Sequence, residues 1–353
     1  MIALQAGGPS VVAVGGGHGL ARTLGAARRF AGSLAAVVSV ADNGGSSGRL
    51  REALAIPAPG DLRRAIGAML ACPDRLQGLL EHRFGSGELA GHAFGNLLIA
   101  ACADYQADFV EGVAQACRLL GTLGPVYPAT IEPVVLRGEH PRGSVRGQVE
   151  VMATAGLTKV GVEPEDARTP PEALEAVREA DLVVLGPGSL FTSVLAALAA
   201  PELAGAIGET RGLVVYVCNL REQQPETAGF DVAAHLSALL AHGIRPGVVV
   251  ADLGAIAPGR LPSDIPLVAA SLTRARQGLV HDEARLGEVL AALHSGARGP
   301  RTSFLPPRRL GSPEPGSLAS SGMGALDTGT TLDTAAPTPA GELGGDGELP
   351  GAS

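Results

Sequence analysis

Two segments of the chain combine glycine with polar side chains, and each follows a short apolar run. The run Val11–Val14 leads into Gly15-Gly16-Gly17-His18-Gly19, and the run Leu34–Val40 leads into Asp42-Asn43-Gly44-Gly45-Ser46-Ser47-Gly48-Arg49. Glycine lets the backbone turn sharply and approach a ligand, and the free N–H groups at a helix start attract anions. Both segments predict phosphate binding, the second as an exposed loop whose N–H groups form an anion nest. For the first segment, a tight strand-to-helix turn without a ligand is the alternative.

Charged groups accompany the second segment. Asp42 ends its strand where a dinucleotide-binding fold places the acid that binds ribose, and Arg49 supplies positive charge. Further on, Asp61 and Arg63 are candidate ligand-binding residues, with Asp61 as a simple helix N-cap as the structural alternative. Arg63 follows in the first helical turn, where a cation opposes the helix dipole, so a nearby anion would explain it. A bound ligand would supply that anion, and a purely structural helix start is the alternative.

His92 and Asn96 stand four residues apart at the start of an apolar stretch. At that spacing they share one helix face, so both are expected to point into one cleft. A lone histidine is usually structural, but this pair beside Gly91 favours a functional role.

A third glycine turn follows the apolar run Leu182–Leu185 and reads Gly186-Pro187-Gly188-Ser189, with Thr192 soon after. It repeats the arrangement of the first turn and predicts ligand binding through free amides and hydroxyls, with Ser189 as a simple N-cap as the alternative. Asn219 opens another polar loop at the same expected sheet edge. The turn lacks the Gly-x-Ser-x-Gly elbow, so we exclude a serine hydrolase.

Metal and covalent chemistry find little support. His, Glu and Cys show no metal-ligand spacing, although Asp42 alone would allow Mg²⁺ to bind against a phosphate. The 4 cysteines lie far apart in apolar runs and are expected to be buried free thiols: Cys72, Cys102, Cys117 and Cys218. Lys159 is the sole lysine, so it is the one candidate for any lysine-dependent step.

The overall composition excludes several classes of protein. A formal net charge of −8 lacks the basic field of a nucleic-acid binder, so an anionic ligand must be held by backbone amides and a few arginines. We expect no membrane span and no leader segment, because charges or glycines interrupt every apolar helical stretch. A cytoplasmic protein is expected.

The elements that position these residues alternate between strands and helices. Aromatic residues make up only 3% of the chain, so the core is built from Ala, Val, Leu and Ile. This pattern predicts an α/β fold with a Rossmann-like, doubly wound and mainly parallel sheet, whose ligands bind beyond the carboxyl ends of the strands. We expect a β-hairpin insertion at about 126–151, with a polar turn over Arg137–Ser144. Residues 1–297 are expected to form this domain, and the Gly/Pro/Ser/Thr-rich residues 298–353 a disordered tail.

The chain resembles the gluconeogenesis factor family (YvcK type), relatives of the CofD 2-phospho-lactate transferases. The matching segments run in family order: VVAVGGGHGL, VSVADNGGSSGRLREAL, APGDLRR, HRF, GHAFGNLLIAA, ADLVVLGPGSLFTSVL, VYVCN and GLVHD. They extend from Val11 to about Leu293. Asn43 departs from the family, many of whose members have Asp there.

The resemblance implies a Rossmann-like protein that binds UDP-sugars such as UDP-N-acetylglucosamine and regulates the link between carbon metabolism, cell-wall precursor synthesis and cell shape. It implies no required cofactor, with Mg²⁺ as an option, a protein partner in amino-sugar or cell-wall precursor synthesis, and possible homo-oligomers. The glycine turns and the Asp42 segment would form the nucleotide site, and Arg274 matches an arginine that the family links to UDP-sugar binding. A CofD-like Mg-dependent transferase is the alternative, and an NAD-dependent oxidoreductase is a more distant one.

Overall fold

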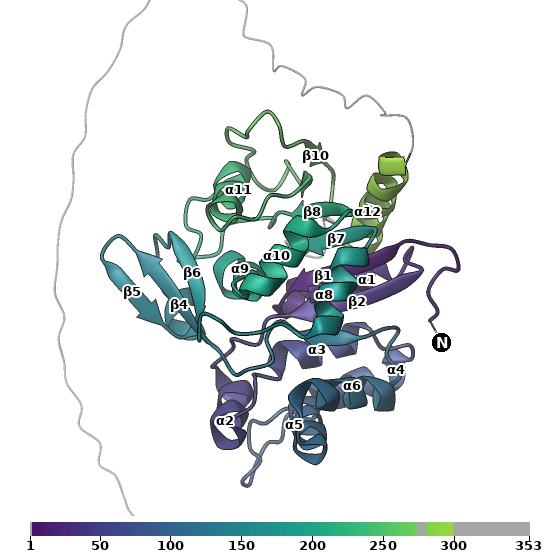
Figure 1. Ribbon diagram of the computed structural model, residues 1–353, viewed down its shortest axis with the longest axis vertical. Coiled ribbons are helices and arrows are strands. Elements are labelled where there is room, and N and C mark those ends of the chain that lie inside the picture. Colours follow the sequence, from purple (N-terminus) through teal and green to yellow (C-terminus); the bar gives the residue numbers. More distant parts are fainter. Residues whose placement is uncertain (1, 274–279, 299–353) are drawn as a thin grey trace, which may run out of the picture. The chain divides into compact units, whose positions relative to one another are not determined.

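A seven-stranded, fully parallel sheet forms the centre of the computed structural model, which describes residues 2–273 and 280–298 (Figure 1). The strand order is β10-β9-β8-β7-β1-β2-β3. The bounds are β1 Ser10–Gly15, β2 Ser33–Val38, β3 Val126–Pro128, β7 Leu182–Leu185, β8 Leu213–Val217, β9 Val248–Ala251 and β10 Leu267–Ala269. The inner strands are apolar and almost wholly buried, as a sheet covered on both faces requires. The predicted α/β class and parallel sheet are confirmed.

The strand order reverses between β1 and β7. The chain first moves from β1 to β2 and β3 on one side, and later from β7 to β8, β9 and β10 on the other. Right-handed crossovers in opposite directions place the connecting helices on opposite faces of the sheet. The carboxyl ends of β1 and β7 therefore flank the point where a doubly wound sheet binds its ligands.

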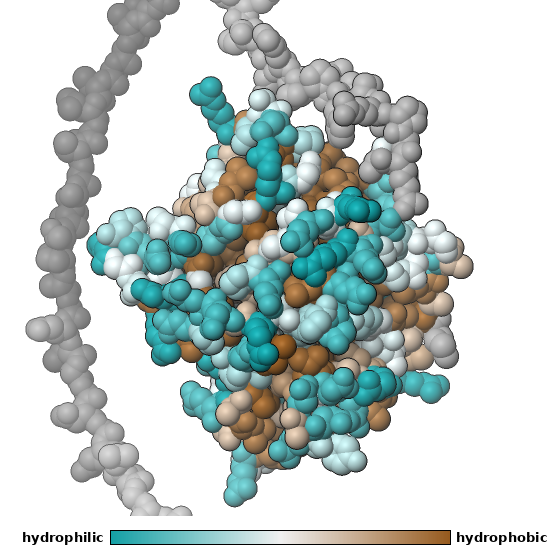
Figure 2. Space-filling view, viewed as in Figure 1, coloured by the Kyte–Doolittle hydropathy of each residue, from teal (hydrophilic) through white to brown (hydrophobic). Residues whose placement is uncertain are grey.

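Helices cover the sheet in two groups. On one side α1 (Gly17–Ala27) packs against α3 (Gly60–Ala68) and α12 (Glu283–Arg298), and on the other α8 (Pro171–Glu179) packs against α10 (Pro201–Glu209). The remaining helices are α2 Gly45–Leu54, α4 Pro73–Glu81, α5 Phe94–Gln106, α6 Phe109–Leu120, α7 Gln148–Met152, the π-helical turn η1 Leu190–Val194, α9 Leu195–Leu198 and α11 Val232–Ala241. Apolar side chains surface among hydrophilic ones where α2, α5 and α6 lie (Figure 2).

The predicted hairpin insertion is part of a separate three-stranded antiparallel sheet, with the order β5 (Gly143–Arg146), β4 (Val135–His140) and β6 (Lys159–Glu163). The predicted start at residue 126 is wrong, because β3 joins the main sheet. The expected polar turn over Arg137–Ser144 is also wrong, since most of it pairs as strand. In β4, exposed Arg137 and Glu139 alternate with buried Leu136 and Gly138, so one face of the strand is exposed to solvent and the other packs against the protein.

The second glycine-rich segment is a helix start and not the loop that we expect from its composition. Helix α2 begins at Gly45 after the N-cap Gly44, so Ser46, Ser47 and Gly48 lie in its first turn. All three are buried, which corrects the prediction of an exposed nest. Serine and glycine are poor helix formers in isolation, and the tertiary contacts described below decide their conformation.

Two general expectations can be compared with the described residues. Three of the cysteines are buried and Cys72 is partly buried, and all four are free thiols, as predicted. Within residues 2–273 and 280–298 no single helix is long and apolar enough to cross a membrane. The predicted tail begins within α12, and its residues 299–353 lie outside the described part of the chain.

Candidate functional site

A cleft of about 370 Å³ opens at the reversal of strand order, over the carboxyl ends of β1, β7 and β8. Its lining comes from four separate parts of the chain and consists of His18, Gly19, Arg22, Pro187, Gly188, Asn219, Leu220, Arg221, Gln223, Val280 and His281. Its volume falls within the range of small-ligand pockets. We refer to it as the switch-point cleft.

Close contact between the first and third glycine turns forms one wall of this cleft. Gly17 has φ +64°, a conformation that favours glycine, and Gly19 has no room for a Cβ beside the Pro187 carbonyl. Thr23 Oγ1 on α1 donates to the Gly186 carbonyl at 2.6 Å. These glycines therefore serve the packing of α1 onto the turn after β7, as well as exposing backbone to the cleft.

Asn219 holds the turn after β7 from the neighbouring strand. Its Oδ1 accepts from the Gly188 N–H at 3.0 Å, and its Nδ2 donates to the Gly188 carbonyl at 2.8 Å. Gln223 Nε2 donates to Ser189 Oγ at 3.0 Å, so the polar loop after β8 braces the same turn. The structure thus brings together the predicted residues Gly188, Ser189 and Asn219.

The helix start after this turn is already occupied by a carboxylate of the chain itself. The Phe191 and Thr192 N–H groups donate to Glu226 Oε1 at 2.7 and 2.9 Å. Glu226 is 1% exposed, and burial raises its pKa. The prediction of free amides at Thr192 is therefore wrong, because Glu226 fills the position that an anionic ligand would take.

Positive charge in the switch-point cleft comes from residues that our sequence analysis did not select. Arg22 lies one helical turn after His18 and forms an ion pair with Glu283 at 3.0 Å. Arg221 is exposed, and no hydrogen bond or ion pair links it to the described residues. His281 Nε2 lies 3.2 Å from the Cys218 carbonyl, and burial lowers the pKa of His281 to about 4, so it is neutral at pH 7.

Asp61 lies beneath the first glycine turn. Gly16 has no room for a Cβ beside its carboxylate, which pairs with Arg64 at 2.5 Å. Burial raises the pKa of Asp61, and the charge of nearby Asp42 adds to the effect against the opposing Arg64. The N-cap of α3 is Pro59, with no side-chain cap, so the alternative interpretation of Asp61 as a helix N-cap is wrong.

The same geometry tests whether Mg²⁺ fits. Asp42 Oδ1 accepts from the Gly44 N–H at 2.8 Å, and Asp61 is committed to Arg64. Among the residues that the structure describes, no group of three or more His, Cys, Asp or Glu side chains is arranged to hold a metal ion. The described residues therefore do not form a magnesium cage of their own.

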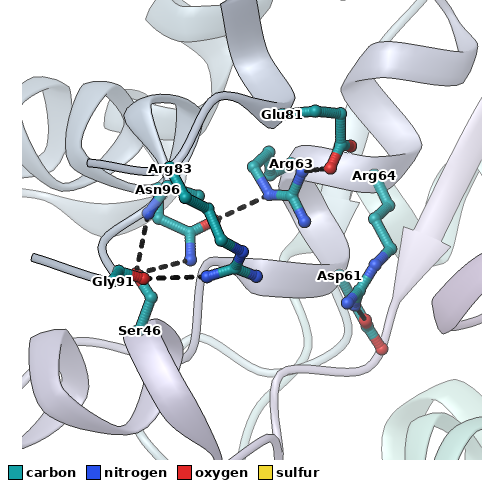
Figure 3. Close-up of polar contacts among 9 residues, drawn as sticks. Ser46, Asp61, Arg63, Arg64, Glu81, Arg83, Gly91 and Asn96 are labelled. Atoms are coloured by element: carbon teal, nitrogen blue, oxygen red, sulfur yellow. Dashed lines mark hydrogen bonds and ion pairs between the residues drawn. The ribbon is translucent and has the colours of Figure 1, made fainter. Parts of the chain in front are cut away.

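A buried polar network connects Ser46, His92 and Asn96. Figure 3 shows the part of it that runs from Ser46 through Asn96 and Arg63 to Glu81. Ser46 Oγ lies 3.1 Å from His92 Nδ1 and 3.1 Å from Asn96 Nδ2, so the predicted meeting of His92 and Asn96 occurs through a serine. Arg63 Nε donates to Asn96 Oδ1 at 3.0 Å, and its guanidinium forms an ion pair with Glu81. The anion that explains Arg63 is thus Glu81, and no ligand is required.

Two further predicted residues of the Asp42 segment, Asn43 and Arg49, have structural partners. Asn43 Oδ1 accepts from the Val149 N–H at 3.1 Å and so attaches the start of α7 to the loop after β2. Arg49 Nη2 donates to the Ala90 carbonyl at 2.8 Å. Arg274 lies outside the described residues.

Known proteins with similar sequences support one family. A family model described as "2-phospho-L-lactate transferase CofD" matches residues 11–281. A protein of Halalkalibacterium halodurans described as "Gluconeogenesis factor" is 40% identical over 236 residues, which cover 66% of this chain and 73% of that protein. A relative from Mycobacterium tuberculosis is 44% identical over 271 residues, which cover 72% of this chain and 77% of its own.

Solved structures agree with the sequence comparison. A crystal structure of a UPF0052 family member from Bacillus halodurans has a TM-score of 0.74 and 34% sequence identity, and the match covers 79% of this chain and 97% of that one. The fold, the ordered motifs and these relatives lead to one assignment. The chain belongs to the CofD family, together with the proteins named gluconeogenesis factors.

Proposed function

We propose that the chain binds a nucleoside diphosphate sugar in the switch-point cleft and that UDP-N-acetylglucosamine is the ligand to test. The observation that carries this proposal is the meeting of two glycine turns with Arg22 and Arg221 at one edge of a doubly wound sheet. Exposed backbone suits a diphosphate, as do the guanidinium of Arg221, unpaired among the described residues, and the guanidinium of Arg22, which also pairs with Glu283. The chain's net charge of −8 makes such local cations the main source of attraction for an anion.

The proposed role is that of a cytoplasmic regulator and not that of an enzyme. Among the described residues, those that line the switch-point cleft include no carboxylate that could act as a general base. His281 donates to a backbone carbonyl, and its neutral form is favoured by burial. We propose that the bound nucleotide sugar is sensed through a protein partner in amino-sugar or cell-wall precursor synthesis, which fits the name of the gluconeogenesis factors.

Isothermal titration with UDP-N-acetylglucosamine tests the proposal. Arg221→Ala should weaken binding by about 10- to 100-fold, because a charge-assisted contact to phosphate is lost. Arg211→Ala is the matched control: it removes an exposed arginine at the opposite end of β8. Binding that is unchanged by Arg221→Ala, or equally weakened by both substitutions, would contradict the cleft as the binding site.

A transferase is the second candidate, because the matching family model carries a transferase name and Asp42 lies close enough to Asp61 to raise its pKa. Incubation with UDP-N-acetylglucosamine for hours, with and without Mg²⁺, distinguishes a regulator from a transferase. Recovery of the intact ligand supports a regulator, whereas consumption that depends on Mg²⁺ and is abolished by Asp42→Asn supports a transferase.

A further inference from the structure

We propose that His92 is a hydrogen-bond donor to an anionic oxygen of the bound ligand, through its Nε2–H, and that Ser46 fixes the tautomer that makes this possible. The proposal takes the presence of an anionic ligand from the proposed function and extends the binding site beyond the switch-point cleft, because His92 is not among the residues that line that cleft. The assignment of the tautomer rests on the described contacts alone.

The direction of every hydrogen bond in the network follows from Arg63. A guanidinium can only donate, so Asn96 must present Oδ1 to Arg63 Nε and Nδ2 to Ser46. Glu81 pairs with the same guanidinium and anchors that end. The orientation of the Asn96 amide is therefore determined by a group whose protonation never changes.

The hydroxyl proton of Ser46 has one remaining acceptor among its neighbours. Its Oγ accepts from Asn96 Nδ2 at 3.1 Å and from the Ala93 N–H at 3.3 Å, which uses both oxygen lone pairs. The hydroxyl therefore donates to His92 Nδ1 at 3.1 Å. Nδ1 must be unprotonated to accept, so the neutral ring carries its proton on Nε2.

This Nε2–H has no partner among the residues that the structure describes. Although His92 is only 9% exposed, its Nε2 is not among the fully buried unpaired atoms of the described residues, so the N–H reaches the surface and can bind a water molecule or a ligand. Burial and the charge of Arg49 lower the pKa of His92, which keeps the ring neutral. The neutral ring is the state that the Ser46 contact requires.

The surroundings favour an anionic acceptor. Arg49 Nη2 donates to the Ala90 carbonyl at 2.8 Å, two residues before His92. This hydrogen bond holds the Arg49 guanidinium close enough for its charge to act on the His92 ring. A cation beside an N–H donor suits a phosphate or carboxylate oxygen. Ser46 itself is 4% exposed with both lone pairs used, so it is a positioning residue and not a nucleophile.

Nitrogen-15 NMR of the labelled imidazole rings tests the tautomer in the full chain without ligand. We expect the unprotonated ring-nitrogen signal of His92 to belong to Nδ1 and the N–H signal to Nε2. Ser46→Ala should convert this single tautomer into a mixture, because Nδ1 loses its donor. A proton on Nδ1 in the unmodified protein would overturn the proposal.

Binding of UDP-N-acetylglucosamine tests the contact with the ligand. His92→Gln places an amide N–H near the position of Nε2 and should keep the affinity within about threefold, whereas His92→Asn lacks that reach and should lose about tenfold or more. His82→Asn, at an exposed histidine whose ring contacts Phe84, is the matched control. Equal affinity of His92→Asn and the unmodified protein would overturn this proposal and leave the proposed function standing. A lack of binding by the unmodified protein would count against the proposed function itself.

Discussion

At the scale of single residues, the polar side chains of the predicted site form hydrogen bonds within the chain at least as often as they line a cleft. Ser46 receives hydrogen bonds from two groups and gives one. Asn219 binds backbone atoms of the turn after β7, and Glu226 accepts from backbone N–H groups of η1, which follows that turn. A polar residue in a glycine-rich segment is therefore not automatically a ligand contact. Its burial and its partners decide.

Ser46→Ala should lower the free energy of unfolding by at least about 2 kcal/mol, because three buried groups lose their partner. These groups are the Ala93 N–H, Asn96 Nδ2 and His92 Nδ1. Ser47→Ala is the adjacent control and should change stability by less than about 1 kcal/mol, since no hydrogen bond ties the Ser47 hydroxyl to the described residues. Chemical denaturation of both variants measures the difference, and equal losses would show that the network contributes nothing particular.

At the scale of elements, the start of η1 shows how a carboxylate can replace a bound anion. Glu226 comes from the loop after β8 and caps a helix that follows β7, so it ties together the two loops at the cleft. It lies beside the switch-point cleft without lining it. The turn Gly186–Ser189 is thereby held before any ligand arrives.

Glu226→Ala should cost about 3 kcal/mol in the free energy of unfolding, because the Phe191 and Thr192 N–H groups lose a buried, charged acceptor. Glu226→Gln retains one acceptor oxygen and should recover about half of that loss. The measurement is denaturant unfolding at neutral pH. If both variants are as stable as the unmodified protein, the carboxylate does not hold the turn.

At the scale of the whole molecule, burial of histidine makes stability depend on pH. The pKa of His281 is about 4 in the folded chain and about 6.5 when exposed, so the unfolded state binds more protons between those values. The contribution of His281 to the free energy of unfolding is fully present above about pH 6.5 and is lost as the pH falls towards about 4. Buried Asp61 and Glu226 act in the opposite direction, because their raised pKa values make the folded state take up protons first.

His281→Gln isolates the contribution of His281, since glutamine keeps an N–H donor for the Cys218 carbonyl but does not titrate. Between about pH 7.5 and about pH 5 the unmodified protein should lose about 2 kcal/mol more stability than the variant. Parallel denaturation series at the two pH values measure this. The same loss in both proteins would show that His281 is not the residue responsible.

The sequence by itself determined the fold class, the parallel sheet and the loops that gather at its carboxyl edge. Alternation of apolar runs with helical stretches is a local pattern, and glycine turns after strands have local causes, so both can be recognised without contacts. The motifs of the family can likewise be recognised from the sequence alone.

Only the tertiary structure decided which polar residues line the switch-point cleft. Ser46 and Arg63 are residue types that are common in binding sites. Groups distant in the sequence nevertheless already form a hydrogen bond with Ser46 and an ion pair with Arg63. Arg22 and Arg221 look ordinary in the sequence, yet the reversal between β1 and β7 brings them to one cleft. Hydrogen-bond satisfaction depends on groups that lie tens of residues apart along the chain, and no periodic pattern records them. For this reason the sequence predicted the edge of the sheet at which the switch-point cleft opens, but not the arginines that line it.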